Sequence, residues 1–210
     1  MPDSHQPSRA PTALRIGAAF AAGAALNLIF GTAGARYLFT RGFDPAWFAL
    51  LGWATAALEG AVGGMAIGGG WPALEFAVAF ALRPALYDVL AGFIFAIGAS
   101  LAPHHHAAAE FVRGAAGGAL ILGIAGAIAA ALVSRRLRVT LDGLWTFALG
   151  GALRSVAASA LVRSIMRGAR ILTGAGAAVV GIGGPALASF IAGALFALRY
   201  SADTRERAHQ

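Results

Sequence analysis

The sequence predicts an all-α fold: a polytopic membrane bundle of six transmembrane helices, arranged as a 3+3 inverted repeat with interrupted third and sixth helices. Three observations predict it. The chain is 59% hydrophobic and 12% charged, whereas a soluble domain carries about 25% charged residues. Six segments are apolar enough to cross a bilayer, and the first three resemble the last three.

A helix that crosses the hydrocarbon core needs about 20 mostly apolar residues. The segments that meet this requirement are roughly 13–35, 45–69, 72–101, 112–133, 142–162 and 171–198. Aromatic residues such as Trp47, Trp71 and Tyr200 lie near their ends, as expected at membrane interfaces. No segment shows the alternating polarity of a transmembrane β-strand. We therefore expect helices throughout.

The predicted repeat also divides the chain into regions. We expect a disordered N-terminal tail at 1–12, a first three-helix repeat at 13–101, a loop at 102–111, a second repeat at 112–198 and a C-terminal tail at 199–210. An alternative for the start is a cleaved signal peptide, because Ala33 and Ala35 fit an A-x-A cleavage site. Asn27 weakens that alternative, since it interrupts the apolar run.

The repeat is visible in two pairs of segments. RPALYDVLAGFIFA at 83–96 resembles GPALASFIAGALFA at 184–197, with Pro84 and Pro185 separated by 101 residues. FDPAWFALLG at 43–52 resembles LDGLWTFALG at 141–150, with Trp47 and Trp145 separated by 98 residues. Two units of three spans each must lie inverted in the membrane, a design typical of transporters. A duplicated scaffold without transport activity is the alternative.

Two prolines predict the interruptions. Proline has no N–H, and its ring clashes with the carbonyl four residues earlier, so Pro84 predicts a break at 80–84. Gly183 and Gly184 before Pro185 predict the same in the sixth helix. The freed backbone groups must be buried in protein or line a wet cavity, and matching interruptions in two halves indicate a transport site. A simple proline kink is the alternative at each place.

Four charged residues lie well inside the apolar segments, away from their starts: Glu59, Arg83, Asp88 and Arg154. A charge at the bilayer centre costs about 2.5–3.5 kcal/mol on insertion scales, so these side chains should face inward and pair. Their counterparts in the other half are uncharged, namely Ala157, Gly184, Ser189 and Ala56 in the same order. We predict a Glu59–Arg154 pair between the second and fifth helices, while Arg83 has the alternative of extending to the membrane interface.

These features favour a small membrane transporter or channel for a small solute or ion, with its site at mid-membrane between the repeats. The predicted binding residues are Glu59, Arg83, Asp88, Arg154, Gly183 and Gly184. In this hypothesis Glu59 binds a proton or cation, and the arginines act as counter-ions or hold an anionic solute. The alternative is a membrane-embedded subunit or substrate-binding component of a larger transport complex, whose Gly60, Gly64 and Gly68 pack on partner helices.

Other classes of protein are disfavoured. There is no cysteine, and no nucleophile with a base lies within the spans, so we predict no catalytic residues, no enzyme activity and no cofactor. His106 and Glu110 have i,i+4 spacing suited to a metal, but a solvated loop is favoured there. The net charge of +7 comes from arginines beside apolar runs. This pattern favours contact with anionic lipid over nucleic acid.

The arginines give a weak indication of orientation. With the N-terminus in the cytoplasm, eight loop or tail arginines lie inside and six outside. We expect a multi-pass protein of the inner (plasma) membrane, in contact with the lipid bilayer and a small solute or ion. A homo-oligomer and an assembly with partner membrane subunits are both left open.

Overall fold

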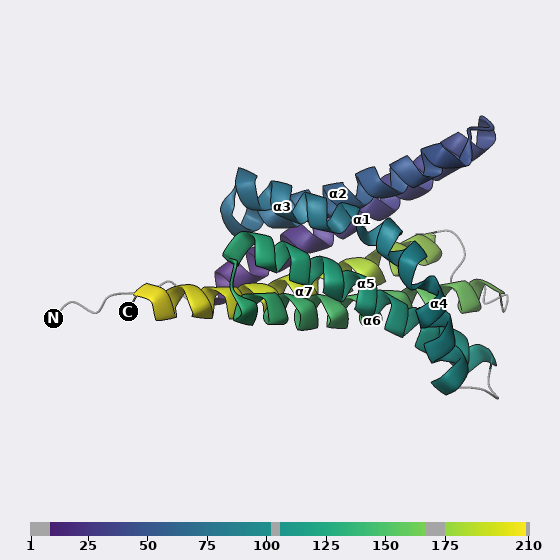
Figure 1. The fold of residues 1–210 in the computed structure, drawn as a ribbon. Coiled ribbons are helices and arrows are strands. Elements are labelled where there is room, and N and C mark those ends of the chain that lie inside the picture. The colour runs from purple at the N-terminus through teal and green to yellow at the C-terminus, as the bar shows by residue number, and fades with distance from the viewer. Residues whose placement is uncertain (1–8, 102–105, 167–174, 209–210) are drawn as a thin grey trace.

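A computed structural model describes residues 9–101, 106–166 and 175–208, and in these residues all regular elements are α-helices (Figure 1). The helices are α1 Arg9–Thr40, α2 Pro45–Gly68, α3 Gly70–Ala81, α4 Arg83–Leu101, α5 His106–Ser134, α6 Leu137–Met166 and α7 Ala175–Ala208. The all-α prediction is confirmed for this part of the chain.

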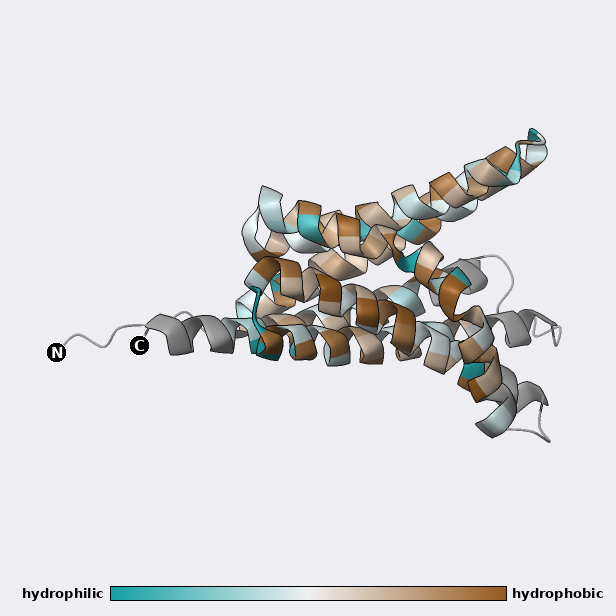
Figure 2. Cartoon of the chain, viewed as in Figure 1, coloured by the Kyte–Doolittle hydropathy of each residue, from teal (hydrophilic) through white to brown (hydrophobic). Residues whose placement is uncertain are grey.

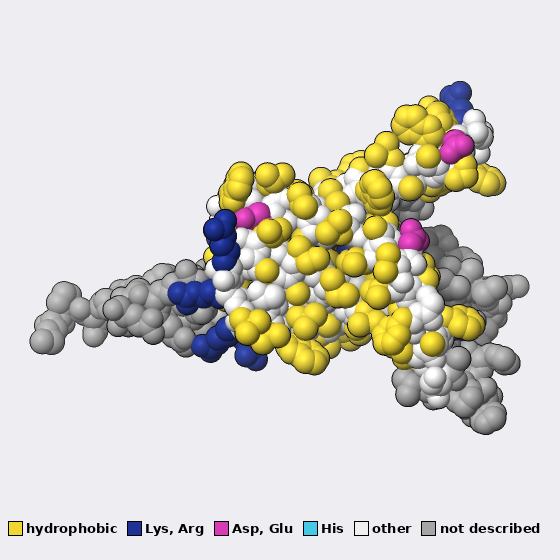
Figure 3. Space-filling model, viewed as in Figure 1, with side chains coloured by type: hydrophobic (Ala, Val, Ile, Leu, Met, Phe, Trp, Pro, Cys, Tyr) yellow, Lys and Arg dark blue, Asp and Glu magenta, His cyan; other side chains and the backbone are white. Residues whose placement is uncertain are grey.

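The chain passes back and forth along the bundle. The α2–α3 and α5–α6 links lie at the same end as the start of α1 and the last turns of α7, whereas the α1–α2 link lies at the opposite end (Figure 1). Arg135, Arg136 and Arg138 are exposed around the α5–α6 link. Figure 3 shows basic side chains gathered at that end of the bundle.

Within the described residues, five segments are long and apolar enough to cross a membrane: Ala10–Thr40, Pro45–Gly68, Gly70–Ile97, Phe111–Ser134 and Gly181–Ser201. α6, which contains the predicted span 142–162, is not among the segments found within the described residues. It packs between α5 and α7 nevertheless. The count of six spans therefore stays a prediction.

Apolar side chains cover the outside of the bundle as well as its interior. Val89 is 81% exposed, and Trp71 and Trp145 are each 71% exposed. Figure 2 shows hydrophobic residues along the helices of the bundle, and Figure 3 shows them covering most of the visible body. A water-soluble protein rarely exposes so large an apolar surface. The helices are thus compatible with a multi-pass membrane protein.

The core is built from phenylalanines that come from both halves of the sequence. The fully buried rings are those of Phe20 on α1, Phe76 and Phe80 on α3, Phe147 on α6 and Phe196 on α7. The centroids of Phe20 and Phe147 lie 5.1 Å apart in an edge-to-face arrangement, which aromatic pairs prefer. The two halves therefore share one hydrophobic core.

Glycines let α2 and α3 approach closely. A Cβ at Gly60 would collide with the backbone of Phe76, and one at Gly64 would collide with the backbone of Pro72. The interpretation that this glycine face packs on a partner helix is wrong, because α3 of the same chain already occupies it. Gly69 joins the two helices with a φ of +90°, a conformation that favours glycine.

The third predicted helix is interrupted, as expected, but the sixth is not. Leu82 alone separates α3 from α4, with its N–H donating to the Ala79 carbonyl at 3.3 Å and its carbonyl accepting from Leu86 at 2.9 Å. Pro84 then occupies the first turn of α4, where its missing N–H is not needed. From this point α4 takes a different direction from α3 (Figure 1).

α7 continues through Pro185 from Ala175 to Ala208, so the predicted interruption at Gly183 and Gly184 is wrong. Proline removes only one hydrogen bond from the helix interior. The following turns present Ala188, Ala192 and Phe196 to the core, and all three are buried. This packing holds the helix together across the proline.

Several boundaries differ from the expected ones. α1 begins at Arg9, inside the predicted tail 1–12, since Pro11 lies in the first helical turn, where proline is tolerated. α5 begins at His106, inside the predicted loop 102–111, and α7 extends to Ala208 within the predicted tail 199–210. The histidines just before His106 lie outside the described residues.

Candidate functional site

Glu59 on α2 is the centre of a buried ion cluster. Its side chain is 0% exposed and accepts hydrogen bonds from three residues. Arg154 Nη1 donates to Oε1 at 2.8 Å and to Oε2 at 3.0 Å, while Arg83 Nη2 donates to Oε2 at 2.7 Å. The predicted pair between Glu59 and Arg154 is confirmed. A carboxylate buried this deeply needs such partners.

The helix interruption brings Arg83 to this cluster. Arg83 is the first residue of α4 and is 8% exposed. Its Nε donates to the Phe80 carbonyl at 3.3 Å, and its guanidinium lies 4.8 Å from the centre of the Phe80 ring. Arg83 therefore points into the protein and does not extend to the membrane interface.

Asn27 on α1 is the third partner, and the sequence interpretation did not include it. Its Nδ2 donates to Glu59 Oε2 at 2.6 Å. One turn earlier, Gly23 lies so close to α2 that a Cβ there would be 2.7 Å from the Glu59 carbonyl. Residues four apart share a helix face, so Gly23 allows the close approach that lets Asn27 reach the carboxylate. The sequence signal for this role was the isolated amide side chain of Asn27 in an otherwise apolar run.

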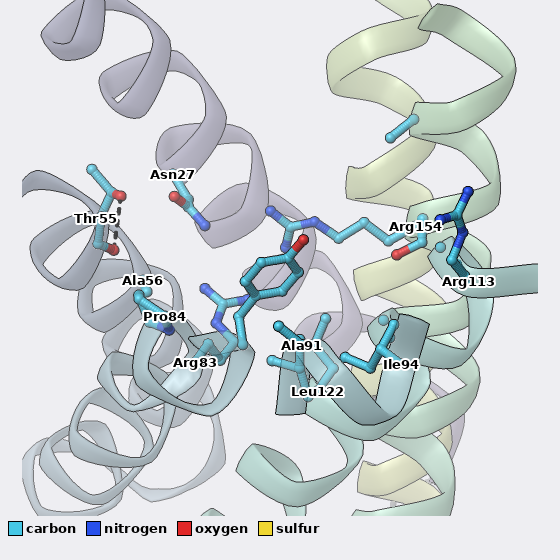
Figure 4. A pocket seen from close by; sticks show the side chains of 18 of the residues that line it. Asn27, Thr55, Ala56, Arg83, Pro84, Ala91, Ile94, Arg113, Leu122 and Arg154 are labelled. Carbon is cyan, nitrogen blue, oxygen red and sulfur yellow. Dashed lines mark hydrogen bonds between the residues drawn. The ribbon is translucent and has the colours of Figure 1, made fainter. Parts of the chain in front are cut away.

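A cavity of about 650 Å³ lies beside this cluster (Figure 4). Its walls come from α1, α2 and α4 of the first half and from α5 and α6 of the second. Figure 4 shows Arg83 and Arg154 pointing toward one another from opposite sides of it. Known small-molecule pockets have volumes of about 300–1,000 Å³, so the cavity has the size of a ligand site.

Most of the lining is apolar or glycine, with a few polar groups. The polar lining residues are Asn27, Thr55, Arg83, Tyr87, Arg113, Arg154 and Ser155. Glu59 itself does not line the cavity, and none of the lining residues is acidic. Sequence reasoning missed Thr55, Tyr87, Arg113 and Ser155, since hydroxyl groups and an arginine near a helix end give no distinctive pattern.

The other predicted site residues lie elsewhere. Asp88 is exposed on α4 and does not line the cavity, because five residues after Arg83 the helix has turned to a different face. Gly183 and Gly184 lie on the continuous α7 and are also absent from the lining. The structure thus brings together Glu59, Arg83 and Arg154 but leaves the other three apart.

Comparison with protein-family models, curated proteins and solved structures finds no match to this chain. The described residues contain no group of three or more histidine, cysteine, aspartate or glutamate side chains that could hold a metal ion. The distinguishing features of the site are thus its charges, its shape and its position between the two halves of the chain.

Proposed function

We propose that this chain is a small multi-pass membrane transporter or channel for a small solute, and that the cavity beside Glu59, Arg83 and Arg154 is its site. The observation that carries the proposal is a buried ion cluster that joins both halves of the chain beside a cavity, within an otherwise apolar bundle. Ionisable groups inside membranes are costly and are characteristic of substrate and ion pathways.

The packing of the helices supports a 3+3 inverted repeat. Within the first half α1 packs on α2 and α2 on α3, as α5 packs on α6 and α6 on α7 in the second half. Between the halves, α1 packs on α7 as α5 packs on α3 and α4. In this arrangement α6 corresponds to α2, and it crosses the membrane as a sixth span. Inverted halves of this kind alternate between states open to opposite sides.

The basic end of the bundle supports an orientation. Positive residues are enriched in cytoplasmic loops, so in this proposal the exposed arginines around the α5–α6 link face the cytoplasm, and the protein lies in the inner membrane. The alternative role as a subunit of a larger complex loses its main sequence argument, because the Gly60 and Gly64 face packs on α3.

Accessibility of the cavity from both sides of the membrane tests the proposal. The chain has no cysteine, so a single introduced cysteine reports one position. In oriented proteoliposomes, Ala91→Cys in the cavity lining should react with small membrane-impermeant thiol reagents added outside and, separately, trapped inside. Reaction from one side only, or from neither, would contradict a transport site.

Two control variants calibrate this measurement. Thr40→Cys, at the end of α1, and Ser134→Cys, at the end of α5, should each react from a single side, and the two sides should be opposite. Reaction of both from the same side would contradict the predicted topology.

A further inference from the structure

We infer that the cavity binds a small organic anion, with a carboxylate or similar head group on a compact apolar body. This inference rests on the proposed function, since it names the class of solute for the same site. Three features of the site support it: the net charge of the ion cluster, the hydrogen-bond donors that Arg154 has left, and the shape of the cavity.

The charges of the cluster do not cancel. Two guanidinium groups, those of Arg83 and Arg154, share the single carboxylate of Glu59. No acidic residue lines the cavity, so no second carboxylate faces these arginines across it. A buried charge without a partner is strongly unfavourable, and an anionic ligand would supply that partner.

Arg154 also has donors left for a ligand. Its Nη1 donates to both oxygens of Glu59, while its Nε and Nη2 make no hydrogen bond within the described part of the chain. Its side chain is 17% exposed and lines the cavity. Guanidinium groups bind carboxylates through paired, charge-assisted hydrogen bonds. Arg154 is therefore the residue best placed to hold an anionic head group.

The shape of the cavity points to an organic solute. Beyond the arginines, the lining consists mainly of glycine and apolar side chains, including Ala91, Ile94, Phe95, Ile121 and Leu122. A bare inorganic anion would fill little of about 650 Å³ and would leave these walls against water. An apolar body fits them, with the head group at the arginines.

In this arrangement Glu59 positions the arginines and does not touch the solute. It is fully buried, and its hydrogen bonds from Arg83 and Arg154 fix both guanidinium groups at the edge of the cavity. This role replaces the hypothesis from the sequence that Glu59 binds a proton or cation.

Ligand-dependent thermal stabilisation tests the inference. The purified full-length chain in detergent would be heated with hexanoate or benzoate, with the neutral hexanamide or benzamide, and with the cationic hexylammonium. The carboxylates should raise Tm in a concentration-dependent way, because a ligand that binds only the folded state stabilises it. Equal stabilisation by the amides, preference for hexylammonium, or no effect of any probe would overturn the inference.

Variants locate the binding. Arg154→Gln should weaken carboxylate affinity at least about tenfold, since it removes a charge-assisted contact. Ala91→Trp keeps every charge but fills the cavity, and it should abolish the stabilisation even if Arg154→Gln does not fold. Arg199→Gln is the matched control, because Arg199 is 69% exposed and lies at 3.7 Å from Asp142, outside the cavity. Unchanged affinity in Ala91→Trp would overturn the inference.

The two proposals fail in different ways. Carboxylate binding together with one-sided labelling of Ala91→Cys would support the ligand class and overturn transport. Two-sided labelling without carboxylate binding would support transport and overturn the ligand class.

Discussion

In the proposed inverted repeat, the contact of α2 with α4 corresponds to the contact of α6 with α7, yet the two contacts are chemically opposite. In the first, Glu59 pairs with Arg83 at 2.7 Å. In the second, the counterparts Ala157 and Gly184 meet, and a Cβ built on Gly184 would lie 2.8 Å from the Ala157 Cβ. The same place thus holds a buried ion pair in one half and two of the smallest residues in the other.

If the halves are repeats, as proposed, this difference indicates how a site can arise in one of them. Large charged side chains need space and partners, and the interruption at Leu82 provides the space by starting a new helix at Arg83. Ala157 and Gly184 instead allow α6 and the uninterrupted α7 to pack closely. The cavity therefore lies beside α4, where the helix is interrupted, and not beside the continuous part of α7 around Pro185.

Removing the shared carboxylate should have the largest effect. Glu59→Gln leaves the buried Arg83 and the partly buried Arg154 without a counter-charge, so we expect a loss of about 3–5 kcal/mol in the free energy of unfolding. Denaturant unfolding of the purified protein in detergent measures it. At the corresponding position of the other half, Ala157→Ser should cost far less. A loss below about 1 kcal/mol for Glu59→Gln would show that the ion cluster contributes little to stability.

The amount that the sequence could predict differs between these two regions. An acid deep in an apolar segment must find a cation, so the pairing of Glu59 with Arg154 followed from the cost of burying charge. The pairing with Arg83 did not follow, because it depends on the direction that the chain takes after the break. Pro84 and Pro185 have similar sequence surroundings, yet one begins a helix and the other lies within one.

The helices themselves were predictable because long apolar segments have few alternatives in a membrane. The residues that line the cavity are harder to predict from the sequence, since they depend on which helix faces meet. Tyr87 lines the cavity and the adjacent Asp88 does not, although both follow Pro84 closely. Only the packing of α4 against the other helices distinguishes them.

A double-mutant cycle tests whether the cluster acts as a unit. Glu59→Gln combined with Arg154→Gln should be less destabilising than the sum of the single changes, with a coupling of about 1–3 kcal/mol. Rescue should stay incomplete, because Arg83 keeps its charge and loses its counter-ion. Additive losses in unfolding experiments would show that the contact between Glu59 and Arg154 carries no coupling energy.

Overpacking the tight contact in the other half should have a smaller effect. Gly184→Ala places a methyl group against Ala157 and should cost about 1–3 kcal/mol, with partial recovery when Ala157→Gly is added. Gly183→Ala is the matched control, because nothing lies within 4 Å of its Cβ position. It should be neutral or slightly stabilising, since alanine favours the helix by about 1 kcal/mol over glycine. Equal thermal shifts for both variants would show that the α6–α7 contact is not tight.

The smallest effect is expected for Asp88→Asn, although this residue was predicted to bind the solute. The residues around Asp88 in the sequence are as apolar as those around Arg83, but Asp88 is exposed and does not line the cavity. Replacing its carboxylate by an amide should therefore change the unfolding free energy by less than about 0.5 kcal/mol, as for most surface changes. Carboxylate affinity, measured by thermal stabilisation, should also be unchanged. A clear change in affinity would mean that the site extends along α4 beyond the cavity. The first half would then contribute a second charged residue of α4, Asp88, to the site.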